Sequence, residues 1–212
     1  KIISKKIFKK KKLLTPNYFF INAVNYQKYL KEKFLKNSSL NYPMVVKPSN
    51  EGSSIGVEIC KNFIQLKKTV VKLIKNHKTL IIENYIAGQE IQVAVLNGKA
   101  LGAIELKPKR KFYDYQAKYN PKANTEHIIP VDLEKKDLNK ITNIAARVHK
   151  IIGCRGVTRS DFKFYKGSFY LLEINTQPGM TKLSLVPEIA DYAGISFIKL
   201  IEWILKDASI NR

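Results

Sequence analysis

The chain has 212 residues, of which 45% are hydrophobic, 10% aromatic and 26% charged. This apolar content is enough for a sizeable core, in one domain of two lobes or in two small domains, and it excludes a disordered tail. Lys and Arg number 38 against 17 Asp and Glu, a formal net charge of +21. Such a charge ordinarily suggests a nucleic-acid partner, but the lysines are spread along the whole chain, so we expect no nucleic-acid partner.

Three features argue against a secreted or membrane protein. No uncharged apolar run approaches the roughly 18 residues of a membrane span. The segment Lys1–Lys12 alternates lysine with apolar residues and lacks the apolar core of a secretory signal. Two cysteines, Cys60 and Cys154, are too few for a disulfide framework or a four-ligand zinc site. We therefore expect a cytoplasmic protein with no membrane partner.

The first part of the chain is predicted to form a short helix and four strands. In order these are Lys1–Lys12, Tyr18–Val24, Met44–Lys47, Ile55–Cys60 and Leu80–Glu83. Before the last strand, Asn62 and Gln65 have the spacing of a capping box. Apolar residues then recur at helical spacing, at Phe63, Leu66, Val70, Leu73 and Ile74, which predicts a second helix between the last two strands.

The second part is predicted to contain two hairpins and two helices. The hairpins are Glu90–Leu96 with Ala100–Leu106, about Asn97-Gly98, and Asp161–Tyr165 with Phe169–Asn175, about Lys166-Gly167. A long helix capped by Asp132 should end at Gly153, and a last helix should bury Phe197, Leu200, Ile201 and Ile204. His77 and His149 lie in or beside lysine-rich helices and are expected at the surface. Because hairpins outnumber βαβ units, we expect antiparallel or mixed sheets covered by helices.

Two carboxylates and an amide in the second hairpin predict a metal site. Glu173 and Asn175 are two apart in a strand and share a face. If the turn closes a three-residue loop in which Tyr165 pairs with Phe169, Asp161 lies directly opposite Glu173. Like charges placed opposite one another destabilise a sheet, so a cation is expected between them, and oxygen ligands suit Mg²⁺. The alternative is that neither residue binds a metal: Asp161 would only end a strand, and Glu173 would lie on a face exposed to solvent.

The loop 47–56, KPSNEGSSIG, joins two predicted strands. It lacks the spacing of a P-loop, but small residues between strands can direct backbone N–H groups toward a phosphate chain. Lys47 would add a positive charge at the end of a buried strand. Taken alone the segment is equally consistent with a tight hairpin that binds nothing.

Six sequence blocks together resemble the D-alanine–D-alanine ligases. They are MVVKPS and EGSSIG at 44–56, IE and GQE at 82–90, FYDYQAKY at 112–119, RSD at 159–161, LEINTQPGMT at 172–181 and SLVP at 184–187. The resemblance runs from about Lys1 to the end of the chain. It implies the α+β ATP-grasp fold, in which two lobes with mostly antiparallel sheets, covered by helices, hold a nucleotide between them.

The same resemblance implies the domain organisation. Residues 1–82 would form the central lobe with the phosphate loop 47–56, and residues 83–212 the carboxy-terminal lobe. A lid is expected at about 107–125 and the metal site within 159–175. The amino-terminal domain of the family has no counterpart here, so the chain is expected to be the ATP-grasp portion of a longer enzyme.

Site roles follow from the resemblance, residue by residue. The implied nucleotide-binding residues are Lys1 and Lys47 for the phosphates, Glu83 for the adenine amino group, Glu90 for the ribose, Tyr85 and Ile86 around the base, and Lys118. The implied catalytic residues are Arg159 and the Gly179 N–H at the oxyanion, with Ser53 and Tyr119 as a pair that closes loops over the site. Ser184 and Leu185 would hold the second D-alanine, and Asp161, Glu173 and Asn175 would bind two Mg²⁺ ions, with Mn²⁺ as an alternative.

The implied function is ATP-dependent ligation of two D-alanines into D-alanyl-D-alanine through an acyl phosphate. The product would serve peptidoglycan synthesis, and hence cell-wall biogenesis and cell shape, and the enzyme would be a cytoplasmic homodimer. Tyr119 favours the dipeptide over a D-alanyl ester. Another ATP-grasp carboxylate–amine ligase, or a D-Ala–D-Ser or D-Ala–D-Lac ligase, is the nearest alternative. A basic RNA-binding module is the alternative of another class, because lysines and aromatic residues interleave in 107–119.

Overall fold

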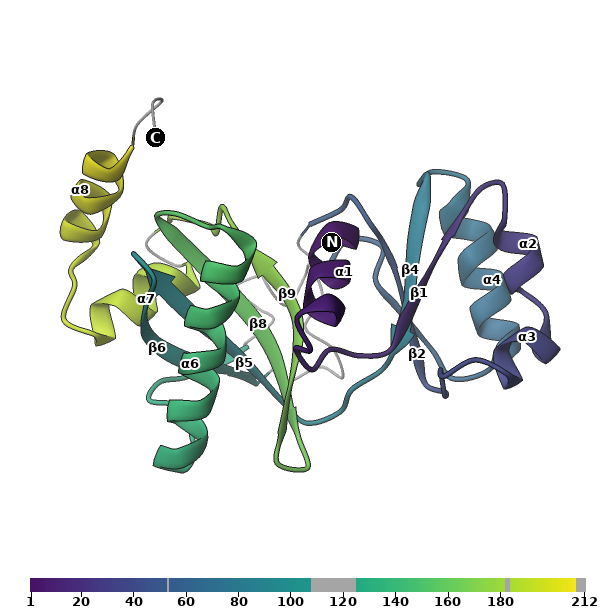
Figure 1. The fold of residues 1–212 in the computed structure, drawn as a ribbon, viewed down its shortest axis with the longest axis horizontal. Helices are drawn as coiled ribbons and strands as arrows, with labels where there is room; N and C mark the ends of the chain where they lie inside the picture. Colours follow the sequence, from purple (N-terminus) through teal and green to yellow (C-terminus); the bar gives the residue numbers. More distant parts are fainter. Residues whose placement is uncertain (53, 108–124, 182–183, 209–212) are drawn as a thin grey trace. The chain divides into compact units, whose positions relative to one another are not determined.

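The computed structural model describes residues 1–52, 54–107, 125–181 and 184–208. The chain divides into two compact units, the first formed by Lys1–Ala87 and the second by Gly88–Lys107 with the residues from Glu126 onward. Each unit contains one sheet, and every strand pair in the described residues is antiparallel, as predicted (Figure 1). The domain boundary expected after residue 82 would fall inside β4, Thr79–Asn84.

The first unit is a four-stranded sheet with helices on both faces. Its strands are β1 (Tyr18–Asn22), β2 (Met44–Pro48), β3 (Glu58–Cys60) and β4, in the order β1-β4-β2-β3. The helices α2 (Tyr26–Tyr29), α3 (Glu32–Lys36) and α4 (Phe63–Ile74) cover one face. The core there includes Val46, Leu66, Val70, Leu80 and Ile82. Asn62 caps α4 by accepting from the Gln65 N–H at 3.0 Å, as the spacing predicts.

Helix α1 (Ile2–Lys10) lies on the opposite face of that sheet (Figure 1). Neighbouring residues of a strand point to opposite faces, so Ile82 faces α4 whereas Glu83 faces α1. The two buried residues of α1, Lys5 and Phe8, are three apart and therefore share the side of the helix that packs inward. A lysine thus occupies a core position of an otherwise lysine-coated helix.

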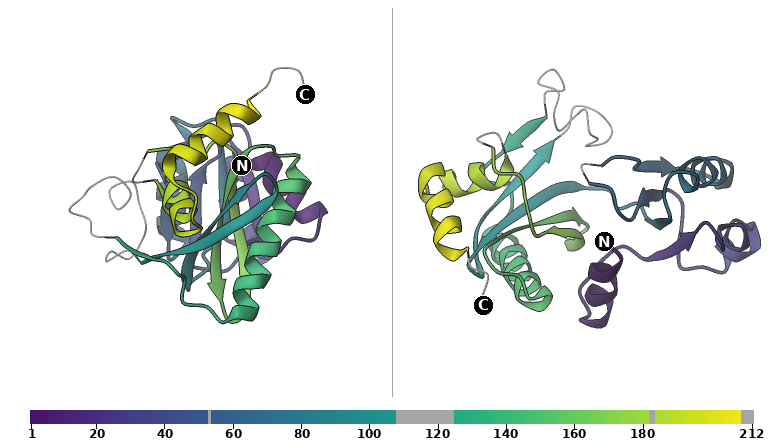
Figure 2. Two further views of the ribbon diagram at one scale, coloured as in Figure 1. Left: turned by 90° about the vertical axis from the view of Figure 1, so that its left-hand side faces the viewer. Right: turned by 90° about the horizontal axis from the view of Figure 1, so that it is seen from above.

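The second unit is a five-stranded sheet in the order β7-β6-β5-β8-β9. The strands are β5 (Gln89–Leu96), β6 (Lys99–Lys107), β7 (Glu126–Ile128), β8 (Val157–Tyr165) and β9 (Ser168–Asn175). Helix α6 (Lys135–Ile152) covers the face that carries Thr158, and α7 (Leu185–Tyr192) packs on the other face, where Ile189 lies close to Gly102 (Figure 2). Helix α8 (Phe197–Asp207) contacts α7. No helix in the described residues is both long and apolar enough to cross a membrane.

The predicted elements differ from the observed ones mainly at their ends. Strand β1 stops at Asn22 because the Asn22 side chain accepts from the N–H groups of Val24 and Asn25, at 3.0 and 2.9 Å, and turns the chain. Helix α6 begins after Glu134, so the prediction of Asp132 as its cap was wrong. The helices α2, α3 and α7 and the strand β7 were not predicted. Of these, α2, α3 and β7 are too short to show a periodic pattern.

The expectation of a surface position for His149 was wrong. Only 4% of the residue is exposed, and its Nδ1 lies 2.9 Å from Thr158 Oγ1 on β8. His149 follows Val148, Ala145 and Ile141 on the buried stripe of α6, which a pattern based on lysine content does not reveal. Burial lowers the pKa of the His149 imidazole below its ordinary value.

His149 should make the stability of the second unit depend on pH. The unfolded chain takes up a proton on this residue below about pH 6.5, whereas the folded state, whose His149 pKa is lower, does not. The contribution of His149 to the free energy of unfolding should therefore be fully present well above about pH 6.5 and should fall as the pH drops below about 6.5. Urea unfolding between pH 7.5 and 5 should show this loss, and His149→Gln should reduce it. An identical pH profile for the two proteins would exclude His149 as the cause.

Gly88 at the start of the second unit accepts no side chain. Its φ is +95°, and a Cβ there would lie 2.1 Å from the carbonyl oxygen of Phe164. Gly98 has a similar φ of +74° but open space around it. We expect Gly98→Ala to cost about 1–2 kcal/mol of stability from backbone strain and Gly88→Ala to cost clearly more. Chemical unfolding of both variants measures the difference, and equal costs would contradict this account of Gly88.

Candidate functional site

The predicted metal-binding residues do come together in the second unit. Asp161 of β8 pairs directly with Glu173 of β9, and Arg159 pairs with Asn175. Residues directly opposite one another in an antiparallel pair lie on one face, so these four side chains share a face. It is the face opposite Thr158, and therefore the one that α6 does not cover.

The register that produces this cluster differs from the one assumed. The Lys166-Gly167 turn is a two-residue loop in which Tyr165 pairs with Ser168, so the expected pairing of Tyr165 with Phe169 was wrong. The register then shifts by one residue between Asp161 and Phe162, which leaves Leu172 without a partner on β8. This bulge restores the predicted pair of Asp161 with Glu173, and it turns Glu173 to the face opposite the buried Leu171.

Arg159 and Asn175 hold the Asp161 carboxylate from two sides. Arg159 donates from Nε to Oδ1 at 2.7 Å and from Nη2 to Oδ2 at 2.9 Å, and Asn175 Nδ2 donates to Oδ2 at 3.2 Å. Asp161 is 6% exposed, and Glu173 is half-buried. Within the described residues no group of three or more His, Cys, Asp and Glu side chains converges. The cluster instead combines two carboxylates with an amide, a set of hard oxygen donors.

The sequence patterns missed Gln92, a direct neighbour of this cluster. Gln92 of β5 lies directly opposite Asp161 on the same face and is 2% exposed. Its Oε1 is buried and has no hydrogen-bond partner among the described residues. Glu90, predicted to bind ribose, faces Lys163 across the same strand pair and forms an ion pair with it, 3.0 Å from Oε2 to Nζ.

The predicted substrate-binding residues lie at the start of α7. Ser184 is the N-cap of this helix, and its Oγ lies 3.1 Å from the Thr181 N–H and 2.9 Å from Thr181 Oγ1. A Cβ on Gly179 would lie 2.9 Å from the same Oγ. Gly179 therefore lies beside the Ser184 side chain, and a larger residue at 179 would require the Ser184 hydroxyl to move. Leu185 is buried, with 8% of the residue exposed.

A second cluster of predicted residues lies in the first unit. Lys47 of β2 and Glu83 of β4 are buried on the face of the sheet that α1 covers, and the Lys47 ammonium pairs with Glu83 Oε1. Lys5 of α1 pairs with Oε2 of the same carboxylate at 2.7 Å. Burial by itself would raise the pKa of Glu83, but the charges and hydrogen bonds of Lys47 and Lys5 bring it below the ordinary value. Glu83 is therefore ionised in spite of its burial.

The remaining predicted residues are less tightly fixed. Lys1 donates from Nζ to the backbone oxygen of Glu51. Tyr85 and Ile86 follow β4 and are half-buried, and the Tyr85 N–H donates to the Pro43 oxygen at 3.0 Å. Ser53, Lys118 and Tyr119, together with most of the expected lid, fall outside the described residues.

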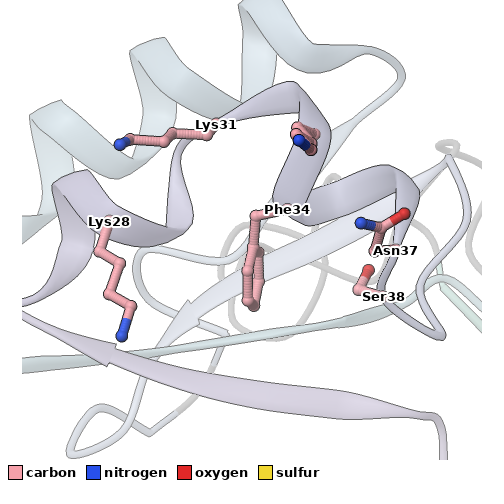
Figure 3. A pocket seen from close by; sticks show the side chains of 6 residues that line it. Lys28, Lys31, Phe34, Asn37 and Ser38 are labelled. Carbon is pink, nitrogen blue, oxygen red and sulfur yellow. The ribbon is translucent and has the colours of Figure 1, made fainter.

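A pocket of about 410 Å³ lies on α2 and α3 of the first unit, on the face of its sheet opposite Lys47 and Glu83 (Figure 3). It is lined by Lys28, Lys31, Lys33, Phe34, Asn37 and Ser38. Its three lysines are exposed, and it contains none of the predicted site residues. Each unit therefore has a candidate cluster of its own, Lys47 with Glu83 in the first and Arg159, Asp161, Glu173 and Asn175 in the second.

Comparison with known proteins identifies the family. The family model described as "D-ala D-ala ligase C-terminus" matches residues 7–206. The chain belongs to the D-alanine–D-alanine ligase family. It is 63% identical, over all of its 212 residues, to a D-alanine–D-alanine ligase of Pelagibacter ubique, and 43% identical over 178 residues, 84% of the chain, to one of Geotalea uraniireducens.

A solved structure of the family confirms the fold. A D-alanine–D-alanine ligase from Bacillus anthracis, crystallised with ATP, superposes with a TM-score of 0.78 at 29% identity over 98% of the chain. The expected α+β ATP-grasp fold is thereby confirmed. The chain spans 68% of the Pelagibacter ligase, 57% of the Geotalea ligase and 65% of the Bacillus chain.

Proposed function

We propose that the protein is an ATP-dependent ligase that joins two D-alanines into D-alanyl-D-alanine. The observation that carries this proposal is the convergence of Arg159, Asp161, Glu173 and Asn175 on one sheet face, in a chain that belongs to this ligase family. A metal-binding donor set beside an arginine is what transfer of a phosphoryl group and attack on a carbonyl both require.

The donor set fits Mg²⁺. Asp161, Glu173 and Asn175 offer carboxylate and amide oxygens on one face of the sheet, and such oxygen donors suit Mg²⁺. These three residues would hold two Mg²⁺ ions, or Mn²⁺ in their place, and the ions would neutralise charge on the ATP phosphates. Asn175 and Arg159 would orient the Asp161 carboxylate.

The nucleotide contacts are assigned to residues of known placement. Lys47 and Lys1 would contact the phosphates, and Glu83 would accept a hydrogen bond from the adenine amino group. Tyr85 and Ile86 would line the base, and Glu90 would bind the ribose hydroxyls. The ionised state of Glu83 supports its role, since a carboxylate only accepts hydrogen bonds. Lys118 is assigned to nucleotide binding, and Ser53 with Tyr119 to loop closure, on the family resemblance alone.

The proposed reaction has two steps. A carboxylate oxygen of the first D-alanine attacks the γ-phosphorus of ATP, the bond to the bridging oxygen breaks, and ADP leaves. The amine of the second D-alanine, bound near Ser184 and Leu185, then attacks the carbonyl carbon of the acyl phosphate and loses a proton. Arg159 and the Gly179 N–H would stabilise the oxyanion, and phosphate leaves with one former carboxylate oxygen. Water must be excluded, because it would hydrolyse the acyl phosphate.

The cellular role follows from the proposed product. D-alanyl-D-alanine made from ATP in the cytoplasm would enter peptidoglycan synthesis, and we propose a homodimer as the working form. Nucleic-acid binding is the competing proposal, and it depends on the segment 107–119. Affinity for an oligonucleotide should then fall steeply with salt, whereas D-alanine-dependent ATP use should survive moderate salt.

Phosphate release by the full-length protein tests this proposal. Release from ATP should require Mg²⁺ and D-alanine, and L-alanine should not replace D-alanine. D-serine, D-lactate and glycine, each added with D-alanine, test the related acceptors. Mg-ATP binding without D-alanine-dependent release would retain the fold and reject the substrate.

A further inference from the structure

We infer that Lys5 is a positioning residue that holds Glu83 as an ionised acceptor and thereby sets the preference of the site for adenine over guanine. This inference rests on the proposed function, in which Glu83 contacts the base. Lys5 lies outside every motif that suggested a function, and it is one of many lysines in its helix. Its place in the fold separates it from the others.

Lys5 is buried as deeply as a core residue. It is 1% exposed, whereas Lys6, Lys9 and Lys10 of the same helix are exposed. Lysine is almost never fully buried unless it is paired, and taking its ammonium out of water is costly. The desolvation of the Lys5 ammonium must therefore be offset by ion pairs and hydrogen bonds.

The partners of Lys5 fix the position of its ammonium. Nζ lies 2.7 Å from Glu83 Oε2 and donates to Thr15 Oγ1 at 2.8 Å, and it stands 5.4 Å from the centre of the Tyr18 ring. Lys47 pairs with the other oxygen of the same carboxylate, so each oxygen of Glu83 forms an ion pair with a lysine. Two cations from different elements, α1 and β2, therefore determine the orientation of one buried carboxylate.

The two ion pairs of Glu83 affect which nucleotide base it can bind. An ionised carboxylate only accepts hydrogen bonds, which matches the amino group of adenine and opposes the carbonyl oxygen that guanine carries at the same place. Burial raises the pKa of Glu83, and the charges of Lys47 and Lys5 lower it. Without Lys5 only Lys47 would oppose the effect of burial, so the pKa of Glu83 would rise. A protonated Glu83 can donate to guanine, so the discrimination should weaken most at low pH.

The test compares ATP with GTP in the full-length protein between pH 6 and 8, in the presence of D-alanine. Lys5→Met removes the buried charge, and Lys6→Met is the matched control, because it removes an exposed charge from the next position. We expect Lys5→Met to lower the ATP:GTP ratio of kcat/KM by about tenfold or more, on the scale of one lost hydrogen bond to a buried charged group. The loss should grow as the pH falls, and the KM for D-alanine should stay unchanged. Lys6→Met should match the parent.

Thr15→Val provides a variant that keeps all charges. It removes the second acceptor of the Lys5 ammonium and should lower the same ratio by about threefold, on the scale of one lost hydrogen bond. If Lys5→Met does not fold, this variant decides the question. An unchanged ratio and pH profile in the folded variants would overturn the role of Lys5 while leaving the ligase proposal intact. A parent protein that does not use ATP would overturn both.

Discussion

Glu173→Ala is expected to lower Mg-ATP turnover by more than about 100-fold without unfolding the protein. Loss of a residue that merely orients a metal ligand already costs about 10–100-fold, and Glu173 is proposed as a ligand itself. The fold should tolerate the change, because Glu173 lies opposite Asp161 and two carboxylates so placed disfavour the sheet. Steady-state phosphate release measures the first effect and thermal unfolding the second.

Glu202→Ala is the control for Glu173→Ala. Glu202 is an exposed carboxylate on α8 of the same unit, so this variant makes the same charge change far from the cluster in sequence. It should retain parental turnover. Near-normal turnover of Glu173→Ala, with an unchanged Mg²⁺ requirement, would remove the metal assignment of this face of the sheet.

Glu83→Ala should destabilise the protein by about 3–5 kcal/mol, the usual cost of stranding buried charge. The variant leaves the ammonium groups of Lys5 and Lys47 buried without the carboxylate that both contact. The midpoint of thermal or urea unfolding measures the loss. Replacing all three charges together, by Lys5→Met, Lys47→Met and Glu83→Leu, should recover most of the stability but not the nucleotide binding.

An exposed ion pair of the same unit provides the comparison for Glu83. Lys72 pairs with Glu58 at 2.9 Å, and its side chain is 70% exposed. Lys72→Ala should therefore leave the midpoint of unfolding close to that of the parent protein. A Glu83→Ala protein as stable as Lys72→Ala would show that the buried cluster does not depend on its carboxylate.

The register of β8 and β9 shows how far the sequence can predict geometry. The alternation of β9 predicted Glu173 and Asn175 on one face, and the assumed hairpin pairing predicted Asp161 opposite Glu173; both are confirmed. The turn beneath them was predicted with one residue too many, and the bulge at Leu172 compensates. Lys166 and Gly167 have φ of 48° and 72°, as a two-residue turn of the primed kind requires. The apolar residues around Leu172 give no pattern from which a bulge could be predicted.

Buried polar residues were the least predictable part of the fold. Lys5 and His149 both belong to helices rich in lysine, and their burial depends on which side of each helix meets its sheet. That orientation is a property of tertiary packing, although the spacing of Lys5 from Phe8 and of His149 from Ala145 is consistent with it. The roles of Lys47 and Glu83 came from the family resemblance, whereas their ion pair came only from the structure.

Transfer of oxygen from D-alanine to phosphate tests the proposed ligase reaction most directly. D-alanine labelled with ¹⁸O in its carboxylate is incubated with ATP, Mg²⁺ and the full-length protein. The dipeptide, ADP and phosphate are then quantified, and their isotope content is measured by mass spectrometry. The reaction through an acyl phosphate predicts D-alanyl-D-alanine in amounts equal to ADP, with one ¹⁸O in each phosphate released. Unlabelled phosphate, or ADP formed without the dipeptide, would contradict the proposed reaction.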